Sequence, residues 1–105
     1  MLLDTHEVLT KAINERRTVI LSYGGRNAGV RICNPHILYR SAQDTVCVDC
    51  YQIGGKTSKG SVLPGWRPFN TGDILSVRPT DETFVTAPGY DPDNRQRYRV
   101  IIAHV

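Results

Sequence analysis

The first residues of the chain carry a helical pattern of polar and apolar positions. Asp4 can act as an N-cap, and Glu7, three positions later, completes a capping box. One face of the following turns is apolar and carries Val8, Leu9, Ala12 and Ile13. The pattern therefore predicts a helix over about residues 5–16.

After this helix the pattern changes to the alternation of β-strands. Turns rich in Gly, Asn, Asp and Ser separate the strand candidates, which are 18–23, 30–40, 45–53, 63–69, 74–77 and 98–105. Within the second candidate, Asn34-Pro35 predicts an interruption because proline cannot donate to a ladder. One helix followed by short strands predicts a mainly β fold, a small, strongly bent sheet or barrel with the helix packed beside it.

Length and composition limit the possible classes of protein. The chain has 105 residues, of which 40% are apolar, and this suits one folded domain with a single core. Its net charge of +3 is a mild basic excess, short of the dense basic stripe of a dedicated nucleic-acid binder. No apolar run approaches a membrane helix or a signal peptide, and three cysteines fit a reducing compartment. We therefore expect a cytoplasmic protein without membrane contact.

The motifs that suggest chemistry are weak. Cys47 and Cys50 have the spacing of a zinc or redox pair, but on a strand they point to opposite faces, so we expect ordinary buried or half-buried residues. Gly54-Gly55-Lys56-Thr57 lacks the first glycine and the helix of a phosphate loop. No nucleophile stands in a recognisable triad motif and no carboxylate pair stands out. The sequence predicts no enzyme, no cofactor and no metal site.

A more specific signal lies in Trp66-Arg67-Pro68-Phe69. Arg67 is flanked by two aromatic residues, and Pro68 stiffens the backbone beside it. A rigid cation among aromatic rings is a common way to build an anion or nucleotide groove. Other arginines and tyrosines occur within the strand patterns, namely Tyr23, Arg31, Tyr39, Arg40, Tyr51 and Tyr98. Each is either a ligand contact or an ordinary solvent-facing strand residue.

The order of these segments resembles a WYL domain over about residues 7–80. The resemblance rests on Ala12-Ile13 before Arg16-Arg17, the strand 19–23, Arg31 to Leu38 after a glycine turn, the strand 46–51, Arg67-Pro68-Phe69, and residues 74–77. The tripeptide that names the family is replaced by Val46-Cys47-Val48, and one N-terminal helix cannot supply a helix-turn-helix. The chain is therefore similar to a divergent, stand-alone member.

The resemblance implies a fold and a function. It implies an SH3-like or Sm-like barrel, within a single domain of residues 1–105 whose barrel strands cover about 18–80 and whose C-terminal strand extension covers about 96–105. WYL domains occur in bacterial transcription regulators as sensors of nucleotide-type ligands or nucleic acid, and several dimerise. We expect a ligand-binding set of Arg67, Arg31, Tyr23, Tyr51, His36 and Trp66. The expected ligand is a nucleotide or a single-stranded nucleic acid.

A second hypothesis needs no small ligand. The chain would then be a homodimer or an adaptor module whose strand over 98–105 pairs with the edge of a partner. An enzyme is the third hypothesis, and it would require a histidine and an acid clustered beside a nucleophile.

Overall fold

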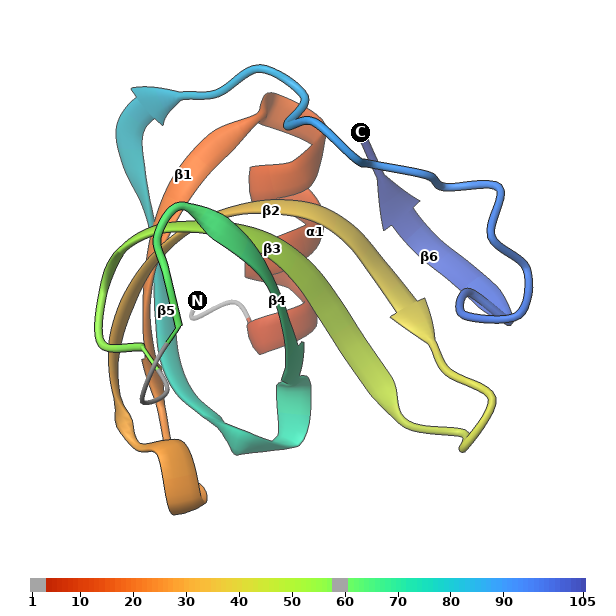
Figure 1. The fold of residues 1–105 in the computed structure, drawn as a ribbon, viewed down its shortest axis with the longest axis horizontal. Coiled ribbons are helices and arrows are strands. Elements are labelled where there is room, and N and C mark those ends of the chain that lie inside the picture. The colour runs from red at the N-terminus through yellow and green to blue at the C-terminus, as the bar shows by residue number, and fades with distance from the viewer. Residues whose placement is uncertain (1–3, 58–60) are drawn as a thin grey trace.

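The fold is mainly β, with one N-terminal helix, as the sequence predicts (Figure 1). The computed structural model describes residues 4–57 and 61–105. Its elements are α1 (Thr5–Glu15), β1 (Arg17–Tyr23), η1 (Gly25–Asn27), β2 (Gly29–Arg40), β3 (Val46–Gly55), β4 (Gly65–Asn70), η2 (Thr71–Asp73), β5 (Ile74–Thr83) and β6 (Val100–His104). In the described part of the chain, no helix has the length and apolar character needed to cross a membrane.

Helix α1 begins and ends close to its predicted bounds. The Asp4 carboxylate accepts a hydrogen bond of 2.8 Å from the Glu7 backbone N–H, which confirms Asp4 as the N-cap. The helix ends at Glu15, because Arg16 takes a left-handed conformation with φ of 53° and its N–H caps two carbonyls of the last turn. Leu9, Ala12 and Ile13, on the predicted apolar face, are buried.

The strands form one antiparallel sheet in the order β4-β3-β2-β1-β5. The sixth strand lies off this path. β2 is long enough to pair with β1 through residues 29–33 and with β6 through residues 37–40, along the same edge. β6 therefore continues the position of β1 along this edge, beyond residues 34–36 of β2.

The sheet is strongly curled, so that β1 and β4 meet although β2 and β3 separate them. The rings of Tyr23 and Phe69 have centroids 5.0 Å apart, and the Tyr23 hydroxyl accepts a hydrogen bond of 3.1 Å from the Asn70 N–H. In a flat sheet three strand spacings would place them about 14 Å apart. β4 and β5 do not pair, however, so the sheet of the described residues is curled but not closed.

Pro35 and Pro79 both lie inside strands. Pro35 pairs with Cys50 while Ile37 pairs with Asp49, so that His36 is the extra residue of a β-bulge. The predicted interruption of β2 is therefore a bulge in one continuous strand. β5 likewise runs through Pro79 to Thr83, beyond the predicted end at residue 77. An end strand tolerates proline there because its outer edge has no partner strand.

Each face of the β2–β3 pair has its own cluster of apolar residues. The inner face and α1 enclose the main core, which contains Leu9, Ala12, Ile13, Val19, Leu21, Cys33, Leu38, Val48, Cys50, Phe69, Ile74 and Ala103. The outer face carries Ile37 and Tyr39, which pack with Tyr98. Cys50 lies in the inner core and Cys47 packs against the outer cluster, so the prediction of opposite faces is confirmed.

Candidate ligand-binding site

The outer face of β2 and β3 is covered by the chain that leads from β5 to β6, residues 84–98, which we call the C-terminal segment. After β5 this segment passes along one end of the sheet and then turns down to β6 (Figure 1). Phe84, Ala87 and Tyr98 are its buried residues. It thus gives the outer face of the sheet an apolar cover of its own.

His36 is the first anchor of the C-terminal segment. The side chain is fully buried at the bulge in β2, in contact with the rings of Trp66, Phe84 and Tyr90. Nε2 accepts a hydrogen bond of 3.0 Å from the Ala87 N–H, so Nδ1 carries the proton and donates to the Asn34 carbonyl at 2.7 Å. Burial lowers the pKa of His36. Both ring nitrogens of the neutral imidazole are therefore engaged inside the fold.

Asp49 is the second anchor. Its carboxylate accepts hydrogen bonds of 2.8 Å from the hydroxyls of Tyr39 and Tyr98, and of 2.7 and 3.0 Å from the Arg97 guanidinium. The Asp49 side chain is 7% exposed, whereas that of Arg97 is 44% exposed. Burial and the hydrogen bond that each hydroxyl donates to Asp49 raise the pKa of both tyrosines. The hydrogen bonds of Arg97 to Asp49 likewise raise the pKa of Arg97. The charge of Asp49 is thus neutralised by a residue of the C-terminal segment.

A cavity of about 430 Å³ opens between β3, β4 and the C-terminal segment. Its lining residues are Asp49, Trp66, Arg67, Pro68, Gly89, Tyr90, Asp91, Asn94, Arg97 and Tyr98. The Trp66 and Tyr90 rings are nearly parallel, at 20°, with centroids 6.0 Å apart. A hydrogen bond of 2.8 Å from Trp66 Nε1–H to the Pro88 carbonyl fixes the indole. The volume lies within the range of small-molecule sites.

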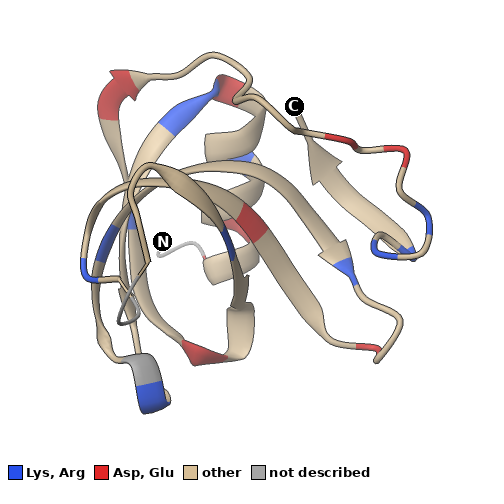
Figure 2. Cartoon of the chain, in the orientation of Figure 1, with Lys and Arg blue, Asp and Glu red and all other residues tan. Residues whose placement is uncertain are grey.

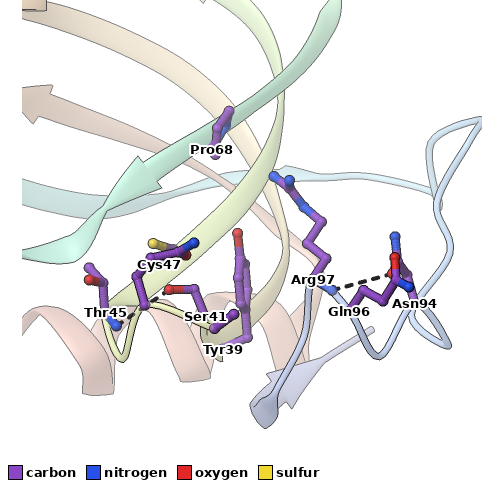
Figure 3. A pocket seen from close by; sticks show the side chains of 10 residues that line it. Tyr39, Ser41, Thr45, Cys47, Pro68, Asn94, Gln96 and Arg97 are labelled. Atoms are coloured by element: carbon purple, nitrogen blue, oxygen red, sulfur yellow. Dashed lines mark hydrogen bonds between the residues drawn. The ribbon is translucent and has the colours of Figure 1, made fainter.

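A second cavity of about 640 Å³ adjoins the first and shares Pro68, Asn94 and Arg97 with it. Figure 3 shows its polar side chains: Ser41 and Thr45 lie below Cys47, and Arg97 reaches across from the C-terminal segment. Among the described residues of this lining, Arg97 is the one that carries a charge. The two cavities are thus neighbours, one with an aromatic lining and the other with a polar but nearly uncharged lining.

The structure divides the six residues predicted to bind a ligand between two faces of the sheet. Trp66 and Arg67 both belong to the lining of the smaller cavity. Successive strand residues point to opposite faces, however, and Arg67 pairs with Cys50 of the inner core, so its side chain leaves β4 on the face opposite that of Trp66. Tyr51 contacts Trp66 at 5.4 Å between centroids, but it lines a separate cavity of about 490 Å³. His36 lies beneath the Trp66 ring, as described above.

The remaining two predicted residues lie on the inner face. The guanidinium carbon of Arg31 lies 6.0 Å from the centroid of the Tyr23 ring and 5.7 Å from that of Phe69. Arg31 is only 3% exposed, so it stacks within the curl of the sheet. The structure therefore does not bring Tyr23 and Arg31 together with Trp66.

Arg67 keeps a charge that no described carboxylate neutralises. Its guanidinium donates to the carbonyls of Trp66 at 2.7 Å and Val62 at 3.2 Å, and its Nε has no acceptor among the described residues. The ion pairs of the described residues do not include it. Gly65 makes room for this conformation, because a Cβ there would lie 2.9 Å from Arg67 Nη1. A carbonyl-bound guanidinium can still accept an anion.

Several residues of the site were missed from sequence, among them Asp49, Tyr90, Asn94 and Arg97. One signal was available for Asp49, a carboxylate within the apolar strand 46–50, which must find a partner when it is buried. No cluster of three or more His, Cys, Asp or Glu side chains that could hold a metal ion occurs among residues 4–57 and 61–105.

The chain matches no family model, and no curated protein or solved structure is significantly similar to it.

Proposed function

We propose that the chain is a WYL-like, non-catalytic module that senses a nucleotide-type ligand through the cavity beside Trp66. One observation carries the proposal: the cavity of about 430 Å³ combines an aromatic platform with a lining that contains the arginines Arg67 and Arg97. Aromatic faces bind nucleobases by stacking, and a guanidinium binds phosphate through charge-assisted hydrogen bonds. A regulatory role follows if binding changes the position of the C-terminal segment, which forms one wall of the cavity.

The ring geometry defines how a base would bind. Two parallel rings need a separation of roughly 7 Å to hold a third ring between them, twice the usual contact distance. Trp66 and Tyr90, with centroids at 6.0 Å, therefore act as a platform on which a base stacks, and not as a slot. Asp91 and Asn94, on the same lining, supply acceptors and donors for the edge of the base.

Charge limits the ligand. The lining of the smaller cavity contains Arg67 and Arg97 together with Asp49 and Asp91, so its formal charge is balanced. A balanced site suits a ligand with one phosphate better than a polyphosphate. A single-stranded nucleic acid would place one nucleotide on the platform and the next in the adjoining cavity.

An SH3-like or Sm-like barrel is part of this proposal. Its support is the curl of the sheet, in which β1 touches β4, and the three-residue η2 that joins the two end strands β4 and β5. Strand ends joined by so short a connection must lie close together.

The single tryptophan gives a direct test, because Trp66 is the only source of indole fluorescence. Wild type and Arg67→Ala would be titrated with adenosine, AMP, guanosine and GMP, and with a short oligothymidylate at two salt concentrations. We expect quenching by the ligands and tighter binding of each monophosphate than of its nucleoside. Arg67→Ala should remove this preference, about 10- to 100-fold for a charge-assisted contact, while Arg78→Ala on the exposed face of β5 should keep it. Unchanged binding by Arg67→Ala would contradict the assignment.

A further inference from the structure

β6 has an edge without a partner strand. It pairs with β2 along one side, and none of the described residues forms a ladder along the other. Ile102 is the extra residue of a bulge, because Leu38 pairs with Ala103 and Tyr39 with Ile101. The backbone groups of a bulged residue are not bound in the ladder. The outer edge of β6 thus forms no ladder with the described residues, and a further strand can pair along it.

Three consecutive branched apolar residues are exposed on this strand. Val100 is 51% exposed, Ile101 39% and Ile102 47%. Natural proteins usually protect an exposed edge strand with charges, prolines or a covering segment, because an apolar edge pairs readily with other chains. The absence of such protection within β6 itself is typical of an edge that a partner covers.

Basic residues gather where the chain enters β6. Figure 2 shows blue segments in the turn before β6 and at the adjoining end of β2, which are Arg95, Arg97, Arg99 and Arg40. Arg40 pairs with Asp44 and Arg97 with Asp49. Arg95 and Arg99 are exposed, and the ion pairs of the described residues do not include them. One end of the apolar edge thus carries a positive charge that no acid of the described chain neutralises.

We propose that the β6 edge binds an extended acidic peptide segment of another protein, which adds a strand to the sheet. Branched apolar side chains of this peptide pack on Val100, Ile101 and Ile102, and its acidic residues lie beside Arg95 and Arg99. A second copy of the chain fits less well. Antiparallel pairing of two β6 strands would bring Arg99 of each copy near the end of the other that carries His104, where the strand has no acid.

This surface is separate from the ligand site. Residues 100–104 line neither the cavity beside Trp66 nor the one that adjoins it. A failure to bind nucleotides would therefore not contradict the peptide site, and a failure to bind peptides would not contradict the nucleotide site.

The test uses designed peptides and the whole chain. Four fluorescein-labelled peptides would share a core of alternating valine and threonine. Two of them carry three glutamates, one at the N-terminus of the core and the other at its C-terminus. The other two carry three lysines at the same positions. Fluorescence anisotropy would compare wild type with Ile102→Lys, Val100→Lys and Arg99→Glu. The matched controls are Leu75→Lys and Arg78→Glu, at exposed positions of β5. Circular dichroism would identify any variant that fails to fold. If either Val100→Lys or Ile102→Lys fails to fold, the other variant tests the β6 edge in its place.

We expect at least one glutamate peptide to bind wild type at least 10-fold more tightly than its lysine counterpart. The substitutions in β6 and at Arg99 should weaken this binding at least 10-fold, and both controls should retain it. Equal binding of the glutamate and lysine peptides, or full binding by folded Ile102→Lys, would overturn the proposal. The proposal would also be overturned if wild type had the mass of a dimer and Ile102→Lys the mass of a monomer, because that result would show that a second copy of the chain occupies the edge.

Discussion

The Asp49 carboxylate on β3 and the Arg97 guanidinium bind each other through two hydrogen bonds of 2.7 and 3.0 Å, although 48 residues separate them in the chain. The same carboxylate accepts from Tyr39 on β2 and Tyr98 in the C-terminal segment. Four donors thus converge on one buried acid, and two of the three residues that supply them are neutral. Asp49 therefore binds the end of the C-terminal segment that leads into β6, as His36 binds its beginning.

Replacing Asp49 by Asn should destabilise the fold. The amide offers one acceptor oxygen in place of two and has no charge for Arg97, so at least one buried hydroxyl loses its acceptor. We expect a loss of about 2–3 kcal/mol in the free energy of unfolding, measured by urea denaturation. Asp44→Asn is the matched control, because it removes an exposed pair with Arg40 and should cost less than about 1 kcal/mol. Equal losses in the two variants would contradict the role of Asp49.

His36 should make the protein less stable in mild acid. Its pKa is lowered in the fold, so below the ordinary value of 6.5 the unfolded chain takes up a proton that the folded chain does not. Its contribution to stability is complete above pH 6.5 and decreases as the pH falls toward the folded pKa. The decrease is at most about 1.4 kcal/mol per pH unit for one proton.

Urea unfolding at pH 7.5 and 5.5 would measure this effect. His36→Gln should be less stable at both values and should lose less on acidification than wild type. His104→Gln, at an exposed position near the end of β6, should keep the full acid-side loss. The interpretation would be wrong if the His36 variant lost as much as wild type.

Two glycines with nearly the same positive φ should differ sharply in their tolerance of alanine. Gly25 has φ of +80° and Gly55 of +84°. A Cβ at Gly25 would contact nothing within 4 Å, whereas at Gly55 it would lie against the Val30 carbonyl oxygen and 2.9 Å from the Arg31 Cα. Gly25→Ala should cost about 1–2 kcal/mol, the ordinary penalty of a left-handed residue. Gly55→Ala should cost at least about 2 kcal/mol more, or prevent folding, because two backbones must separate. Similar unfolding midpoints would contradict this contrast.

The three thiols should react in a fixed order. Cys47 is half-buried and lines the larger cavity, whereas Cys33 and Cys50 are buried in the inner core. Burial raises the pKa of Cys47, so iodoacetamide should modify it slowly near neutral pH and faster as the pH rises. Mass spectrometry of the folded protein should find one adduct, at Cys47, and three only in denaturant. A ligand that fills the larger cavity should protect Cys47, and modification of Cys50 first would contradict the described faces.

The sequence predicted the elements whose signals are local. Helix α1 and β1 follow from the change of apolar period between Ile13 and Thr18, and the turn before β5 from Asn70 to Asp73. Pro35 misled the prediction, because it lies at a bulge, where a missing N–H is tolerated. Only the pairing of strands distinguishes such a position from a break.

The candidate site was predicted only in part, for a related reason. Trp66 and Arg67 are neighbours in the chain, so their aromatic and cationic character is visible as one motif. Asp49 and Arg97 become partners only when the C-terminal segment crosses the outer face, and nothing in either local sequence specifies the other. Residues placed by a long-range crossing of this kind cannot be found from spacing alone.

The cover on the outer face also sets an order of events during synthesis. All residues of the inner core except Ala103 lie before residue 80, so most of that core can assemble once β1 to β5 have left the ribosome. The outer face stays exposed to solvent until Arg97 and Tyr98 have emerged, because these two residues cover Ile37, Tyr39 and the charge of Asp49. The nascent chain thus passes through a partly folded stage in which an apolar patch and an unpaired carboxylate face the solvent. Such exposed surface favours aggregation, so this stage is where the growing polypeptide depends most on chaperones.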